Sequence, residues 1–184
     1  MSSRSRAHAG PMTGVGSAGT RLMILRGNSG SGKTTIAIRL RALATDLVIV
    51  SQDVVRREIL GTRDVADNPS IGLIGLVARY ALDRGGNVVV EGILHAPRYG
   101  AMLRSLVADH QGVSRAYVMD VPFEETLRRH ATKCTADEFG EAEMRAWWHG
   151  LQLVDGLAES VIKVETSADA AAARVLSECG PLLL

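Results

Sequence analysis

Short apolar runs alternate with longer amphipathic stretches from residue 22 almost to the end of the chain. The runs occupy residues 22–25, 47–50, 88–90, 117–119 and 161–164. Continuous apolar runs of this length are typical of strands that are buried on both faces. Between them, hydrophobic residues recur at helical spacing. The alternation predicts an α/β fold in three layers, in which helices cover both faces of a five-stranded parallel sheet.

The predicted helices lie at about residues 33–43, 54–60, 73–80, 97–110, 122–129 and 168–178, and another runs through Trp147 and Trp148. Spacing of i, i+4 and i+7 places Ile36, Leu40 and Leu43 on one face of the first helix. The third helix is marked by Leu73, Leu76, Val77 and Tyr80.

The first 20 residues differ from the rest of the chain in composition. They are rich in Gly, Ser and Ala, and they contain two arginines but no acidic residue. Such a segment buries too little apolar surface to offset the entropy that is lost on ordering. We therefore expect a disordered tail over residues 1–20 and one domain over residues 21–184, because this length suits a single core.

The overall composition, 46% hydrophobic and 22% charged, is that of a globular protein. The formal net charge of +1 gives no electrostatic footprint for nucleic acid or an anionic membrane. No apolar run approaches the roughly 18 residues of a membrane span. Cys134 and Cys179 lack metal-ligand spacing and are interpreted as reduced thiols, so we expect a cytoplasmic protein.

The strongest motif is GNSGSGKTT at residues 27–35, which matches G-x-x-x-x-G-K-[ST] between a predicted strand and a predicted helix. Glycines allow the backbone to wrap a phosphate with its N–H groups pointing inward, and the helix N-terminus adds positive charge. Lys33 then reaches the β- and γ-phosphates, and the Thr34 hydroxyl is placed to bind Mg²⁺. The alternative is a turn that matches by chance. The predicted nucleotide-binding residues are Gly27, Asn28, Ser29, Gly30, Ser31, Gly32, Lys33, Thr34 and Thr35.

Two carboxylates follow predicted strands, where ligands bind in open parallel sheets. Asp53 is a candidate general base that accepts the proton of an attacking hydroxyl, and Arg56, one helical turn later, is a candidate substrate contact. Asp53 could instead cap the helix that follows it. Glu91 is a candidate ligand of Mg²⁺ or of the substrate hydroxyl, or a strand-end acid satisfied by backbone N–H groups.

The loop after Glu91 is expected to overhang the same cleft. His95, Arg98 and Tyr99 are candidate substrate contacts, although such residues also fill local hydrogen bonds. The loop at residues 165–169 lies where an adenine base could rest.

A basic cluster precedes the polar segment 131–140, and together they predict a lid. The cluster comprises Arg128, Arg129, His130 and Lys133, and Arg145 follows the segment. Arg129 is the candidate catalytic cation of this lid, with Lys133 as its alternative. The same spacing also suits ordinary i, i+4 pairs on a solvated helix, such as Glu125 with Arg129.

Three features together make the chain resemble a P-loop kinase of the group that holds polynucleotide 5′-hydroxyl kinases, chloramphenicol phosphotransferase and zeta toxins. They are the loop at residues 27–35, Asp53-x-x-Arg56, and the arginines after residues 120–127. The resemblance implies the strand order 2-3-1-4-5, a base at Asp53, a hydroxyl acceptor, and ATP with Mg²⁺. Glu91 stands where this group often has an aspartate. Which of Glu91 and Asp53 has which role in the site therefore stays open.

These observations predict an ATP-dependent phosphotransferase that moves the γ-phosphate to a hydroxyl of a small molecule, either a metabolite, a nucleoside or an antibiotic. A 5′-hydroxyl polynucleotide kinase is an alternative, which the near-neutral charge disfavours. A regulatory module that binds ATP without catalysis is another. The sequence does not predict the oligomeric state.

Overall fold

The computed structural model describes residues 14–44, 46–132 and 139–180. Five strands form a parallel sheet in the order β2-β3-β1-β4-β5. This confirms the predicted fold class and the strand order that the resemblance implied. The strands are β1 (Arg21–Arg26), β2 (Leu47–Ser51), β3 (Asn87–Gly92), β4 (Val113–Asp120) and β5 (Glu159–Lys163).

The register of the sheet gathers three strand ends around Glu91. Leu25 of β1 and Ser51 of β2 both lie opposite Glu91 of β3. β1 is the central strand, and the glycine-rich loop connects it to α1 (Lys33–Leu43). The end of β3 therefore lies beside the start of this loop, and the end of β2 lies one strand further away.

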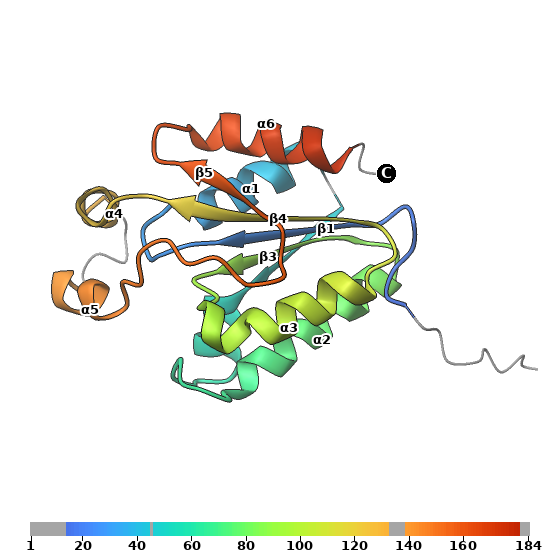
Figure 1. Ribbon diagram of the computed structural model, residues 1–184, viewed down its shortest axis with the longest axis horizontal. Coiled ribbons are helices and arrows are strands. Elements are labelled where there is room, and N and C mark those ends of the chain that lie inside the picture. Colours follow the sequence, from blue (N-terminus) through green and yellow to red (C-terminus); the bar gives the residue numbers. More distant parts are fainter. Residues whose placement is uncertain (1–13, 45, 133–138, 181–184) are drawn as a thin grey trace, which may run out of the picture.

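Helices cover the sheet on both faces (Figure 1). α1 and α6 (Ala168–Cys179) lie on one face, and α2 (Pro69–Asp83) and α3 (Ala96–Asp109) lie on the other. Each face has its own apolar core, with Leu40 and Val175 in one and Ile74 and Leu103 in the other. Burying one such side chain fully contributes about 1.5–3 kcal/mol, so the two cores fix the rigid framework that carries the loops.

Three short helices lie outside these layers. η1 (Val54–Ile59) follows β2 and is a π-helix at the place where the sequence predicts a helix. α4 (Phe123–His130) and α5 (Glu141–Ala146) lie near each other beyond the carboxyl ends of the strands (Figure 1). Lys133, Cys134 and most of the segment expected to form the lid lie outside the described residues.

The apolar positions that mark α2 in the sequence do not all face the core. Leu76 and Tyr80 are 64% and 68% exposed, whereas Ile74 is buried. The buried face of α2 carries Gly75, where an added Cβ would lie 3.2 Å from Met102 Cγ on α3. A small residue thus allows the two helices to approach closely, and hydrophobic spacing alone does not reveal this contact.

Two other helix details also differ from the prediction. In α1 the buried stripe follows Ala37, Leu40 and Ala44, and Leu43 is exposed. α5 ends at Ala146, so Trp147 and Trp148 follow the helix and do not belong to it. Leu43 is in the last turn of α1. The buried face of the helix is rotated slightly from the predicted one, and this is enough to place Leu43 in solvent.

Residues 14–20 differ from the expected tail, because they pack on the domain. Val15 is buried, its N–H donates to the carbonyl of Asp109 at 2.8 Å, and its carbonyl accepts from Gln111 N at 2.9 Å. The N–H of Gly16 donates to Asp83 Oδ1 at 2.8 Å. One buried valine with paired backbone groups orders this short segment, which composition could not indicate. The rest of the expected tail, residues 1–13, lies outside the described residues.

Candidate active site

The glycine-rich loop depends on backbone conformations that side chains disfavour. Gly27, Gly30 and Gly32 have φ angles of 148°, 77° and 100°. A Cβ on Gly30 would also lie 2.6 Å from the carbonyl oxygen of Thr126 on α4. Glycine adopts positive φ without a steric clash, so these three residues allow the backbone conformation that a phosphate-binding loop requires.

Lys33 lies buried at the first position of α1, and its ammonium group is held over the loop. Its Nζ donates to the carbonyl of Asn28 at 2.8 Å and to Ser31 Oγ at 3.2 Å. A small cavity of about 70 Å³, which we call the loop cavity, lies beside it. The loop cavity is lined by Ser29, Gly30, Gly32, Lys33, Thr34, Thr35, Asp53, Glu91, Gly92 and Ile93.

Glu91 is 3% exposed, and its Oε2 accepts a hydrogen bond from the Thr34 hydroxyl at 3.1 Å. Thr34 and Glu91 both line the loop cavity. Within the described part of the chain, no three His, Cys, Asp or Glu side chains form a metal cluster. Mg²⁺ usually takes one or two protein carboxylates and fills its other positions with water and phosphate oxygens. The pair of Thr34 and Glu91 fits such a site.

Asp53 borders two cavities at once, the loop cavity and a larger one described below. Its side chain is 63% exposed, and its Oδ1 accepts from Arg56 Nη2 at 2.8 Å. Asp53 occupies the N-cap position of η1, but its side chain makes no capping hydrogen bond, so its carboxylate does not cap the helix. The predicted pair of Asp53 and Arg56 is therefore present as an ion pair at the mouth of the loop.

Arg129 joins α4 to the loop. Its guanidinium donates to Glu125 at 2.7 Å, to the Ser31 carbonyl at 3.2 Å and to the Val164 carbonyl at 3.3 Å. The i, i+4 pair and the contact with the loop thus occur together. The hydrogen bonds of Arg128 and Arg129 lower the pKa of Glu125 to about 2. Arg128 pairs with Glu125, and Arg145 pairs with Glu141 on the surface of α5.

Arg129 also borders a cavity of about 410 Å³ on the β5 side of the loop, which we call the β5-side cavity. Its lining residues include Gly30, Ser31, Gly32, Thr35, Ile36, Val164, Glu165, Thr166, Ser167 and Ala168. This is the position at which the sequence places an adenine base. The structure places Arg129 at this cavity, whereas Lys33 and Asp53 border the loop cavity.

A third cavity, of about 460 Å³, opens on the other side of Asp53. We call it the arginine cavity, because four arginines line it. Its lining residues are Ser29, Gln52, Asp53, Arg56, Arg57, Arg63, Asp64, Val65, Ile93, Arg98, Phe139, Ala146, Trp147 and His149. Arg57, Arg63 and Asp64 are not among the candidate contacts from the sequence. The sequence feature that could have identified them is their position, because all three lie in the polar stretch between β2 and α2.

Of the three candidates after Glu91, only Arg98 lines the arginine cavity. Arg98 Nη1 pairs with Asp64 Oδ2 at 3.1 Å. Tyr99 is fully buried, and its hydroxyl donates to Asp64 Oδ1 at 3.0 Å. Tyr99 is therefore a support for Asp64 and not a surface contact. Burial, together with His149 and then Arg98, lowers the pKa of His95.

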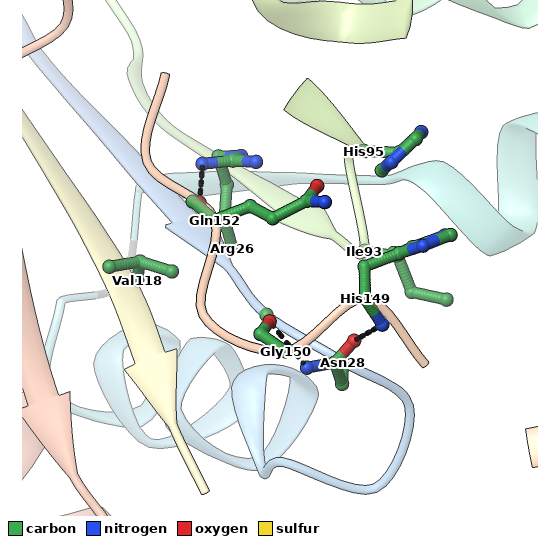
Figure 2. Close-up of a pocket in the computed structure, with 9 residues that line it drawn as sticks. Arg26, Asn28, Ile93, His95, Val118, His149, Gly150 and Gln152 are labelled. Atoms are coloured by element: carbon green, nitrogen blue, oxygen red, sulfur yellow. Dashed lines mark hydrogen bonds between the residues drawn. The ribbon is translucent and has the colours of Figure 1, made fainter. Parts of the chain in front are cut away.

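His95 stacks on His149, with ring centroids 3.9 Å apart. Together with Asn28, these rings border a cavity of about 20 Å³ (Figure 2), which has room for about one water molecule. Asn28 Oδ1 accepts from His149 N at 3.1 Å, and Asn28 Nδ2 donates to the Gly150 carbonyl at 3.0 Å. One amide thus fastens the segment after α5 to the glycine-rich loop.

A family model described as an AAA domain matches residues 22–157. No curated protein sequence matches the chain. Among solved structures, the APS kinase of Mycobacterium tuberculosis, in complex with AMPPNP and APS, superposes with a TM-score of 0.67 at 18% identity, over 90% of this chain and 98% of that one. A gluconokinase from Sinorhizobium meliloti gives 0.60 at 18%, over 87% and 93%. The tunicamycin resistance protein of Deinococcus radiodurans gives 0.60 at 16%, over 88% and 96%.

These matches agree with the fold and with the predicted resemblance to P-loop kinases. At identities this low, the superpositions describe the fold alone. None of the helices in the described ranges has the length and hydropathy that a membrane crossing requires.

Proposed function

We propose, from the premise that this chain belongs to the AAA-domain family and has a P-loop kinase fold, that it transfers the γ-phosphate of ATP to a hydroxyl group of a small molecule. One observation carries the proposal. Asp53 borders both the loop cavity and the arginine cavity, so a single carboxylate stands between a phosphate-binding loop and a space large enough for an acceptor.

In this proposal the nucleotide lies across two of the cavities. The triphosphate occupies the loop cavity under the N–H groups of residues 27–35, and the base occupies the β5-side cavity. Lys33 contacts the β- and γ-phosphates, and Arg129 holds the loop against α4. Thr34 and Glu91 would hold Mg²⁺, which would supply charge neutralisation to the phosphates.

Asp53 is the proposed general base. The acceptor oxygen forms a bond to the γ-phosphorus, the bond from that phosphorus to the β–γ bridging oxygen breaks, and ADP leaves. The hydroxyl proton passes to Asp53, whose carboxylate Arg56 orients through their 2.8 Å contact. We place the reaction in the cytoplasm, which suits Cys179, a buried free thiol.

The test is transfer of a radiolabelled γ-phosphate to pools of nucleosides, sugars and antibiotics. Lys33→Ala is expected to lower turnover at least about 10²-fold, because it removes a preorganised cation from the transferring group. Arg41→Ala, an exposed change on the same helix, is the matched control and keeps full turnover. Full turnover by Lys33→Ala, or no Mg²⁺-dependent binding of any nucleoside triphosphate to the wild-type protein, rejects the proposal.

A further inference from the structure

Gln52 is a buried polar residue directly beside the candidate base, and the steps proposed above do not use it. β2 ends at Ser51, so Gln52 connects this strand to Asp53. Gln52 is 2% exposed, whereas the side chain of Asp53 is 63% exposed. A buried amide is costly unless its oxygen and its nitrogen both find partners. The partners of Gln52 therefore show which parts of the site it holds together.

The oxygen of this amide holds a strained turn after β3. Gln52 Oε1 accepts a hydrogen bond from the N–H of Leu94 at 2.8 Å. Leu94 has a φ of 43°, in the left-handed region that a residue with a Cβ rarely adopts. Arg26 Nε donates to the Leu94 carbonyl at 3.0 Å. Such a conformation persists only where its surroundings fix it, and here two side chains fix the N–H and the carbonyl of one residue.

The same turn lies between the two cavities of the proposed reaction. Ile93, which precedes Leu94, lines both the loop cavity and the arginine cavity. A Cβ added to Gly92 would lie 2.5 Å from the Cβ of Gln52 and from its Oε1. The glutamine therefore packs directly on the end of β3, one residue after Glu91. It links this strand end to the one that carries the candidate base.

The nitrogen of the amide reaches the wall of the arginine cavity. Gln52 Nε2 donates to Asp64 Oδ2 at 3.5 Å, a long hydrogen bond. Asp64 pairs with Arg98, and both line the arginine cavity. One side chain thus contacts both the turn between the cavities and a wall of the space proposed for the acceptor.

We propose that Gln52 is a positioning residue for the phosphate transfer. It fixes the strand end that carries Asp53 against the turn at Ile93 and Leu94, so that the carboxylate faces both cavities. Protein groups engage both ends of its amide, so Gln52 places the reacting groups and does not itself react. The inference rests on the proposed function, because it concerns the placement of that function's base.

The test compares kcat with nucleotide affinity in Gln52→Met, which keeps the length of the side chain and removes both hydrogen bonds. Turnover is measured with the hydroxyl compound that takes up most label from radiolabelled ATP. If no compound takes up label, water is the acceptor, and Mg²⁺-dependent release of labelled phosphate is measured. We expect kcat to fall about tenfold, because small displacements of a reacting group slow the reaction strongly. The Kd for AMPPNP should change less than about twofold, since the loop at residues 27–35 binds the nucleotide.

Gln52→Glu is the conservative variant, because it keeps an acceptor for Leu94 and loses only the donor to Asp64. We expect its kcat to lie about threefold below that of the wild type, again at unchanged Kd for AMPPNP. If Gln52→Met does not fold, this threefold loss decides the inference. Asn87→Leu is the matched control, since it removes a buried amide at the opposite end of β3, and it keeps kcat within about twofold.

Wild-type kcat in Gln52→Met overturns the inference. So does a loss of AMPPNP affinity as large as the loss of kcat, or an equal loss of kcat in Asn87→Leu, because a general structural role would produce either. A kcat of Gln52→Glu no higher than that of Gln52→Met overturns the role of the contact with Leu94. A wild-type protein that neither transfers nor releases phosphate rejects the proposed function and this inference together, whereas the other outcomes leave the proposed function standing.

Discussion

The hydroxyl of Thr34 donates a hydrogen bond to Glu91 over 3.1 Å and so links the first turn of α1 to the end of β3. Glu91 is buried and faces the phosphate loop, whereas Asp53 is exposed between two cavities. The two carboxylates therefore stand in different surroundings. We infer that Glu91 serves the magnesium site and that Asp53 serves the acceptor.

Asp53→Asn is expected to lower kcat at least about 10²-fold and to leave the Kd for ATP nearly unchanged, because the amide cannot accept the hydroxyl proton. Glu91→Gln is expected to raise the Mg²⁺ concentration needed for half-maximal activity. Steady-state kinetics and nucleotide titrations distinguish these effects. An Asp53→Asn protein that loses only ATP affinity would remove Asp53 from the role of base.

Arg129→Gln is expected to weaken ATP binding about tenfold, because it removes the charged contacts from α4 to the carbonyls of Ser31 and Val164. Arg128→Gln is the matched control. Arg128 is 72% exposed at its side chain and pairs with Glu125, so its loss should change affinity less than about twofold. Fluorescent-nucleotide titrations measure both. Equal losses in the two variants would contradict the role of Arg129 at the loop.

Asn28→Ala is expected to destabilise the nucleotide-free protein by about 1–3 kcal/mol, because it leaves backbone groups of His149 and Gly150 without their amide partner. Chemical denaturation measures this change. Gln111→Ala, which alters an exposed amide, should cost less than about 0.5 kcal/mol. A cost for Asn28→Ala as small as that of the control would mean that the segment after α5 does not depend on Asn28.

The stacked histidines predict how stability changes with pH. Burial lowers the pKa values of His95 and His149, and it also lowers the pKa of His110. The unfolded chain therefore binds protons near its ordinary histidine pKa of about 6.5, while the folded protein does not. The contribution of these histidines to the free energy of unfolding is fully present above about pH 6.5. It is lost as the pH falls from there toward the lowered pKa values of the folded protein.

His149→Phe removes one of these titrating groups and keeps the ring and the backbone N–H that Asn28 accepts. Thermal melting between about pH 7.5 and 5.5 should show a shallower loss of stability in this variant than in the wild type. Identical slopes would show that His149 does not contribute to the pH dependence.

The sequence indicates the framework and the phosphate loop well, since both rest on local signals. Continuous apolar runs mark the strands, and the spacing of Gly27, Gly32 and Lys33 marks the loop. The arginine cavity is different. Asp64 pairs with Arg98 and accepts the hydroxyl of Tyr99, yet Asp64 lies more than 30 residues away from both. Such a contact depends on tertiary packing, and no local pattern contains it.

Helix faces show the same limit. Leu76 and Tyr80 have the spacing of a core stripe, but close packing at Gly75 turns them outward. A hydrophobic pattern reports how much apolar surface a helix has, whereas small residues decide which side of it can approach a neighbour.

The amide of Asn28 has a thermodynamic consequence. It belongs to the phosphate loop and holds the backbone of His149, whose ring lines the compartment proposed for the alcohol. We expect an occupant of either compartment to stiffen this shared wall, so that each substrate alters the affinity of the other. By thermodynamic linkage this effect is reciprocal. The factor by which bound nucleotide raises the affinity for the acceptor equals the factor by which bound acceptor raises the affinity for the nucleotide.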